Sequence, residues 1–96
     1  MLACIDDRLA DRLTLPELAA VAGLRVSHFS AAFRASTGQS VHRYVTARRV
    51  ERAQMLLRGG NRSISEVAAE TGFAHASHLA RHMRRLLGAS PRSLRR

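Results

Sequence analysis

The stretch Thr14–Leu24 (TLPELAAVAGL) returns 49 positions later as Ser63–Phe73 (SISEVAAETGF). A second stretch, Ser27–Arg34 (SHFSAAFR), returns 50 positions later as Ser77–Arg84 (SHLARHMR), so the second copy carries one additional residue between its two parts. Each copy spans about 35 residues, which is too few to bury a sufficient hydrophobic core alone. We therefore predict two small helical units that both pack against the segment between them.

Both copies begin with the pattern of a helix N-terminus. Thr14 and Glu17 in the first copy, like Ser63 and Glu66 in the second, have the spacing of a capping box, in which two residues exchange side-chain and backbone hydrogen bonds. Each of these helices is expected to stop at the glycine of its motif, because glycine readily adopts a left-handed turn. A second helix follows each turn. The four helices expected in this way lie at about residues 15–22, 26–36, 64–71 and 76–87.

A long helix is expected between the copies, capped by Ser40 and covering about residues 41–58, before the breaker Gly59-Gly60-Asn61. One side of it is apolar, as a helix that packs against both units requires. The residues on this side are Val41, Tyr44, Val45, Val50, Ala53, Leu56 and Leu57.

Two short helices are expected at the ends of the chain. Residues 2–11 predict an amphipathic helix whose acidic face should point away from any polyanion. Ser90 and Pro91 open a last helix that holds Leu94. The fold is thus expected to be all-α, with seven helices and no strand. In the first helix the apolar residues are Leu2, Ile5 and Leu9, and the acidic residues are Asp6, Asp7 and Asp11.

The chain is strongly basic, and the charge is uneven. All 16 basic residues of the 96 are arginine, and the net charge is +9. Residues 1–48 carry six arginines against four acidic residues, whereas residues 49–96 carry ten against three, and no acidic residue follows Glu70. Such a surface indicates a polyanionic partner, and its concentration in the second half exceeds what a general preference for arginine explains.

In each copy an alanine is followed four residues later by the turn glycine: Ala19 and Gly23, then Ala68 and Gly72. A small residue lets two helices cross closely, and the glycine permits the tight turn. This is the pattern of a helix-turn-helix unit, whose second helix enters the DNA major groove. One match alone is weak, but two matches in a basic chain favour DNA binding over a plain helical bundle.

The chain resembles the AraC/XylS-type DNA-binding domain over about residues 3–96. The most specific part is Ile64–Phe73 with Ser77-His78, Gly88 and Ser90-Pro91, and the stretch from Tyr44 to Leu57 is similar to the linker helix of the family. The resemblance implies two helix-turn-helix subdomains, residues 1–39 and 59–96, joined by a linker helix at residues 40–58. It also implies a transcription regulator, often an activator, with recognition helices in two successive major grooves.

Helix geometry indicates which side chains contact bases. With Phe29 and Phe33 inward in the first recognition helix, and Leu79, Met83 and Leu86 inward in the second, the remaining faces are available to DNA. Arg81 corresponds to the base-contacting position of the family, and arginine paired with guanine is the commonest specific contact. Ala31, its counterpart, can only pack against a thymine methyl group. The candidate base-contacting residues are Ser27, His28, Ser30, Ala31, Ser77, His78 and Arg81.

Phosphate contacts are expected from arginines beside the recognition helices and from backbone amides at helix starts. For a single arginine, simple exposure to solvent is nearly as good an explanation. The candidate phosphate-contacting residues are Arg25, Arg34, Ser40, Arg84, Arg85, Ser90 and Arg92.

No cofactor, metal site or catalytic group is expected. His78 and His82 lie one helical turn apart, but no cysteine or carboxylate stands nearby to complete a metal site, so these histidines and His75 are expected to contact DNA, cap or pack. Nothing places serine, histidine and aspartate as a triad, so we predict no enzyme. Cys4 is expected to be a small buried residue in a reducing cytosol, and no stretch approaches the length of a membrane span.

Two other functions stay open. The alanine at position 31 and the serines of the first recognition helix allow sequence-independent binding of nucleic acid, as in an architectural or RNA-associated module. The basic face also suits an acidic protein partner, and the acidic first helix suits a sensor domain or RNA polymerase. The resemblance implies a bacterial, cytoplasmic, nucleoid-associated regulator whose sensing or dimerisation domain lies outside these residues.

Overall fold

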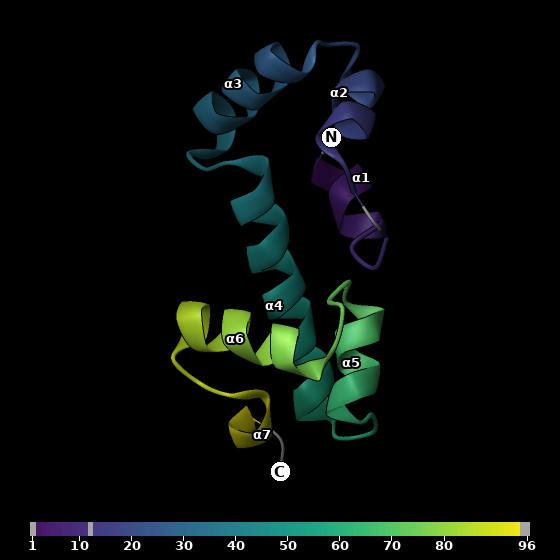
Figure 1. Ribbon diagram of the computed structural model, residues 1–96, viewed down its shortest axis with the longest axis vertical. Helices are drawn as coiled ribbons and strands as arrows, with labels where there is room; N and C mark the ends of the chain where they lie inside the picture. The colour runs from purple at the N-terminus through teal and green to yellow at the C-terminus, as the bar shows by residue number, and fades with distance from the viewer. Residues whose placement is uncertain (1, 12, 95–96) are drawn as a thin grey trace.

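The computed structural model describes residues 2–11 and 13–94, and within α1 the side chains from Ile5 onward. These residues form seven α-helices and no strand, which confirms the all-α prediction. The molecule is elongated, 44 × 22 × 19 Å, with α4 as a rod between two groups of helices (Figure 1). The helices are α1 (Leu2–Asp7), α2 (Leu15–Ala22), α3 (Val26–Thr37), α4 (Val41–Gly59), α5 (Ile64–Glu70), α6 (Ala76–Leu87) and α7 (Pro91–Leu94).

The predicted capping box is confirmed at α5, and only one of its two bonds to the backbone forms at α2. At α5, the hydroxyl of Ser63 accepts the N–H of Glu66 at 3.0 Å, and the carboxylate of Glu66 accepts the N–H of Ser63 at 2.9 Å. At α2 the box is altered, because the carboxylate of Glu17 accepts the hydroxyl of Thr14 at 3.0 Å while that hydroxyl oxygen accepts the N–H of Glu17 at 3.3 Å. Each such cap typically contributes about 1 kcal/mol to helix stability.

The first hydrophobic core joins α1, α2 and α3 to the first half of α4. Two aromatic pairs organise it: the rings of Phe29 and Phe33 lie 5.9 Å apart, and Phe33 meets Tyr44 of α4 edge-on at 5.4 Å. Ala19 is buried at the crossing of α2 and α3, where a small residue was expected. The buried residues of this core are Ile5, Leu9, Leu18, Ala19, Phe29, Phe33, Val41 and Val45.

The second hydrophobic core joins the other half of α4 to α5 and α6. Ala68 is fully buried where α5 meets α6, and the hydroxyl of buried Thr71 donates to the carbonyl of Val67 at 2.7 Å. The linker helix therefore packs against both units, as predicted, with one core on each half of its length. The buried residues of this core are Val50, Ala53, Leu57, Val67, Ala68, Phe73, Leu79 and Met83.

The first helix is shorter than predicted. It ends at Asp7, and the chain then turns, with the N–H of Asp11 bonded to the carbonyl of Arg8 at 3.0 Å. The reason is that Arg49 of α4 donates to the carbonyls of Leu9 and Asp11, which holds this segment out of the helix. Leu9 is nevertheless buried. The predictions for the Leu2 and Cys4 side chains lie outside the described side chains.

The prediction that Leu86 is buried is wrong. Its side chain is 41% exposed, whereas Leu79 and Met83 of the same helix are fully buried. Since α6 crosses α4 (Figure 1), its last turn extends past the second core, and Leu86 lies in a surface hollow beside His42 and Arg43.

Candidate nucleic-acid interface

The first recognition helix, α3, presents the face that the sequence predicts. Phe29 and Phe33 point into the first core, whereas Ala31 and Ala32 between them are exposed. Arg25 precedes the helix as its N-cap and makes no side-chain capping bond there. Of the predicted contact residues here, Ser30 is half-buried and the others are exposed: Arg25, Ser27, His28, Ala31 and Arg34.

The second recognition helix, α6, presents a more basic face. Leu79 and Met83 anchor it in the second core. The predicted contact residues Ser77, Arg81, Arg84 and Arg85 are exposed, as is Arg92 in α7. Ser40 and Ser90, whose helix starts are predicted to bind phosphate, are half-buried, and their hydroxyl oxygens accept N–H groups three residues on, at 3.2 Å each.

His78 has an intramolecular partner on each ring nitrogen. Its Nδ1 accepts the N–H of Ala74 at 3.2 Å, and its Nε2 lies 3.2 Å from Nε2 of His82. Because Nδ1 is an acceptor, the neutral ring carries its proton on Nε2 and donates it toward His82. The ring of Phe73 packs edge-on against His78 at 5.5 Å. His78 thus holds the turn between α5 and α6, and its contact with a base stays a prediction.

Another histidine caps the second recognition helix. Nδ1 of His75 accepts the N–H of His78 at 3.2 Å, one of the donors that a helix start leaves without a helical partner. The sequence left open whether these histidines cap, pack or contact DNA, and the structure gives them capping and packing contacts. Among the described residues, no group of three histidine, cysteine, aspartate or glutamate side chains is placed to hold a metal ion.

Both members of the histidine pair resist protonation. Partial burial, which disfavours the charged imidazolium, lowers the pKa of His78 and of His82 from the ordinary value of 6.5. Nearby positive charge lowers both pKa values further: Arg81, His75 and Arg49 act on His78, and His78, Arg81, Arg85 and His42 act on His82. The neutral pair is therefore the form that the folded chain stabilises.

Acidification from about pH 7.5 to about pH 5.5 is expected to lower the thermal midpoint of this domain. The histidines of the unfolded chain take up protons near pH 6.5, whereas His78 and His82 in the folded chain do so only at lower pH. The unfolded state then binds more protons, so the free energy of unfolding falls as the pH falls through this window. Thermal melts followed by circular dichroism measure the effect. The double variant His78→Gln, His82→Gln should show a weaker dependence, and an unchanged one would contradict the assignment.

A basic groove connects the two recognition helices along the first half of α4. Three adjoining surface hollows form it. The first and second hollows share Arg34 and Ser40 as lining residues. The third hollow shares His42 with the first and Arg43 with the second. The sequence analysis missed His42, Arg43 and Thr46, because it treated this stretch only as a core-forming helix. We define the basic groove by Arg34, Ser40, His42, Arg43, Thr46, His82 and Arg85; its first hollow is also lined by Arg49 and by the apolar residues Leu13, Leu15, Leu18, Val41 and Val45.

The acidic residues do not neutralise the basic groove or the arginines of the recognition helices. Asp6 and Glu51 pair with Arg48 at 3.0 and 2.6 Å, and Glu70 pairs with Arg62 at 2.9 Å. Arg8 pairs with Asp11 at 3.1 Å and with Glu17 at 3.6 Å. Within residues 2–11 and 13–94, no ion pair involves the arginines of the two recognition helices or of the groove, which are Arg34, Arg43, Arg81, Arg84 and Arg85.

None of the helices described here is both long and apolar enough to span a bilayer. The longest, α4, carries charged side chains along its length.

Known proteins share this sequence and this fold. Residues 18–96 match the family model described as a helix-turn-helix domain. Over 77 residues the chain is 32% identical to the HTH-type transcriptional activator Btr of Bacillus subtilis, which covers 80% of this chain and 15% of that protein. Over 95 residues it is 30% identical to the HTH-type transcriptional activator RhaS of Klebsiella pneumoniae, covering 99% of this chain and 34% of that protein. The chain therefore spans about a third or less of the length of these relatives.

Among solved structures, the DNA-binding domain of the global transcriptional factor AdpA, in complex with a target DNA, matches with a TM-score of 0.91. The two sequences are 34% identical, and the match covers 96% of this chain and 83% of that one.

Proposed function

This chain belongs to the helix-turn-helix family of AraC-type DNA-binding domains, and we propose that it binds double-stranded DNA in a sequence-specific manner as the output domain of a transcription regulator. The family is one of DNA-binding regulator domains and not a family of enzymes. The observation that carries the proposal is the pair of recognition helices, α3 and α6, on one rod with an unneutralised basic groove between them.

The length of the molecule supports contact with two successive major grooves. One helical turn of DNA is about 34–36 Å long, and helices that enter successive grooves must be separated by about that distance. The chain is 44 Å long, with α3 near one end of α4 and α6 crossing it near the other (Figure 1). Each unit thus contacts one major groove. The two proposed subdomains are residues 1–39 and 59–96, and the linker is residues 40–58.

The second unit is the main source of base specificity in this proposal. Arg81 extends from the outward face of α6, and its guanidinium can donate two hydrogen bonds to the edge of a guanine. Ser77, one turn earlier, is also exposed and adds a hydroxyl that can donate or accept. In the first unit, Ser27, His28 and Ser30 offer hydrogen bonds, whereas Ala31 offers only a methyl contact.

Phosphate contacts come from the arginines that flank these helices. Arg25 and Arg34 serve the first unit, and Arg84, Arg85 and Arg92 serve the second. The amides at the starts of α4 and α7, after Ser40 and Ser90, add neutral donors. The basic groove supplies Arg43 between the two sets, where the phosphate backbone passes from one major groove to the next.

The Arg81→Ala variant tests the proposal. After binding sites are selected from a random duplex library, the variant is expected to bind the selected site about 1–3 kcal/mol more weakly and to lose preference at one base pair. Fluorescence anisotropy against the selected site and its single-base variants measures both effects. The Arg84→Ala control should weaken all duplexes alike. Equal losses for Arg81→Ala on selected and random duplex would sink the assignment.

Sequence-independent binding is the second candidate, and the exposed Ala31 favours it. Competition with random duplex at one fixed salt concentration separates the two, since specific binders typically prefer their site by about 10³-fold or more. A preference of only a few-fold for the selected site would favour the second candidate.

The whole regulator is proposed to be longer than this domain. The relatives extend well beyond the matched region, so we infer that a sensing or dimerisation domain is joined to these residues. RNA polymerase is the natural partner if the regulator is an activator, and the chromosome of a bacterial cell is then the place of action.

A further inference from the structure

The two units do not share one hydrophobic core. The first core ends on α4 at Val45 and the second begins at Val50, and the four residues between them are only half-buried. A single helix is the covalent connection across this gap, and long helices are rarely straight, so the helix alone does not set the exact angle between the units. Recognition of two grooves requires a fixed distance and angle between α3 and α6. Contacts beside the helix are therefore needed to hold the units in place.

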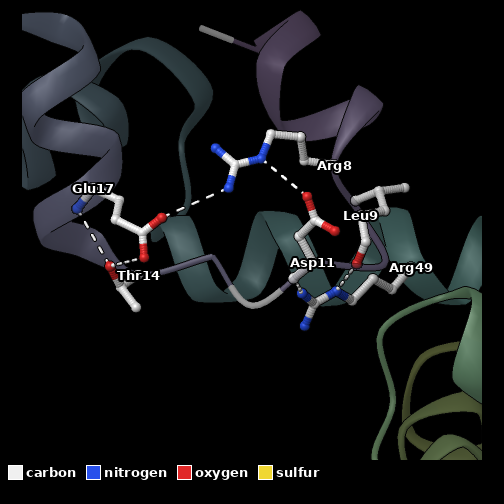
Figure 2. A network of polar contacts seen from close by, with 6 residues as sticks. All are labelled: Arg8, Leu9, Asp11, Thr14, Glu17 and Arg49. Carbon is white, nitrogen blue, oxygen red and sulfur yellow. Dashed lines mark hydrogen bonds and ion pairs between the residues drawn. The ribbon is translucent and has the colours of Figure 1, made fainter.

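Arg49 makes such a contact from the middle of α4. Its Nε donates to the carbonyl of Leu9 at 2.9 Å, and its Nη2 donates to the carbonyl of Asp11 at 2.8 Å (Figure 2). Hydrogen bonds from a guanidinium are stronger than neutral ones, and two on one rigid plane fix an orientation. Burial lowers the pKa of the Arg49 guanidinium. The bonds tie the turn between α1 and α2 to the linker helix.

The same turn of the first unit is braced by an ion-pair chain. Arg8 pairs with Asp11 at 3.1 Å and with Glu17 at 3.6 Å, and Glu17 accepts the hydroxyl of Thr14 (Figure 2). These groups are exposed, so each pair alone contributes little to stability. Together they connect the turn to the N-terminus of α2, the first helix of the first helix-turn-helix unit.

Gly72 brings the second unit to this contact. It follows α5 with φ 86°, and a Cβ atom placed on it would collide with the carbonyl oxygen of Leu9 and lie 2.7 Å from Nε of Arg49. The glycine therefore packs its backbone directly on the hydrogen bond between Arg49 and the first unit. The corresponding glycine of the first copy, Gly23, has a similar φ of 73°, yet its Cβ would meet nothing within 4 Å.

We propose that Arg49, the carbonyls of Leu9 and Asp11, and Gly72 form an interdomain joint that sets the spacing of the two DNA half-sites. This inference rests on the proposed function, because it assigns to Arg49 and Gly72 the positioning of both recognition helices. Neither residue touches DNA in this assignment. Their loss frees one unit to move relative to the other while each unit keeps its own core and its own DNA-contacting face.

The two glycines provide a matched test. Gly72→Ala and Gly23→Ala both place an alanine in a left-handed turn, so both carry the backbone strain of that conformation. Only Gly72→Ala also wedges a methyl group into the joint. Arg49→Met is the second variant, and Arg52→Met is its control, because Arg52 is exposed one turn further along α4 and its loss removes the same charge.

The first measurement needs no DNA. Spin labels at Ser36→Cys and Leu87→Cys, exposed residues near the ends of α3 and α6, are introduced in a Cys4→Ala background. Pulsed electron resonance is expected to give one narrow distance distribution for the unmodified joint and for Gly23→Ala and Arg52→Met. Gly72→Ala and Arg49→Met should give a clearly broader distribution with unchanged helix content. If the distance distributions of Gly72→Ala and Arg49→Met were as narrow as those of the controls, the proposed joint would be refuted.

The second measurement uses the selected duplex and two derivatives in which the spacer between half-sites is one base pair longer or shorter. One base pair displaces the half-sites by about 3.4 Å and rotates them by about 35°, so the parent chain should bind the derivatives at least about tenfold more weakly. Gly72→Ala and Arg49→Met should reduce this ratio to below about threefold, and the controls should retain it. If Gly72→Ala and Arg49→Met instead lost the same factor of affinity on all three duplexes, the inference would be overturned. Failure of the parent chain to prefer any sequence would instead refute the proposed function.

Discussion

Raising the salt concentration from about 50 to about 200 mM is expected to weaken binding of this chain to its selected duplex by about 10³-fold. The proposed phosphate contacts come from six arginines, and each neutralised phosphate releases condensed counterions from the duplex. The slope of log K against log salt should then be about −5. Anisotropy titrations at four or five salt concentrations measure it. The six arginines are Arg25, Arg34, Arg43, Arg84, Arg85 and Arg92.

The basic groove can be tested by the same slope. The double variant Arg43→Ala, Arg85→Ala should make the slope less steep by about two, because each residue is assigned one phosphate. Arg62→Ala is the control, since Arg62 already pairs with Glu70 at 2.9 Å, away from the groove. A double variant with the slope of the parent chain would show that DNA does not enter the groove.

The Leu79→Ala variant is expected to lower the free energy of unfolding by about 2–5 kcal/mol. Leu79 is fully buried in the second core, so its truncation removes buried apolar surface and leaves a cavity between α6 and its neighbours. A domain of this length has a total stability of about 5–14 kcal/mol, so the variant loses a large share of it. Urea unfolding followed by circular dichroism gives the midpoint and the slope needed for the comparison.

Leu86→Ala is the matched control on the same helix. Because its side chain is 41% exposed, it should cost less than about 1 kcal/mol. The two variants also distinguish the structure from the sequence prediction, because the helical pattern predicted that both leucines are buried. Equal destabilisation by the two substitutions would mean that the last turn of α6 packs more deeply than the structure shows.

The sequence contained enough to predict most of the helices and several of their ends. Thr14 and Ser63 fix two helix starts through short-range hydrogen bonds, and Gly23, Gly38 and Gly88 fix three ends, so local chemistry decides these boundaries. The shared linker followed from the small size of each copy. These features depend on residues close together in the chain.

The errors and omissions depend on residues far apart in the chain. The early end of α1 depends on Arg49, some forty positions away, which binds the carbonyls of Leu9 and Asp11. The exposure of Leu86 depends on where α6 crosses α4, which helical periodicity does not encode. The sequence predicted Gly72 only as a turn residue, and its close contact with Leu9 and Arg49 was not predicted. The outward faces of α3 and α6 were predicted correctly in general, while their DNA contacts stay predictions.

The separation between the cores and the outward faces bears on how such a domain can change its target during evolution. Ser27, Ala31, Ser77 and Arg81 are exposed and belong to neither core. Surface substitutions usually change stability by no more than about 0.5 kcal/mol. Under the proposed base contacts, new operator sequences can therefore be explored by mutation at these positions with little risk of unfolding. His78 is the exception: any replacement there must also preserve the turn that presents its neighbours.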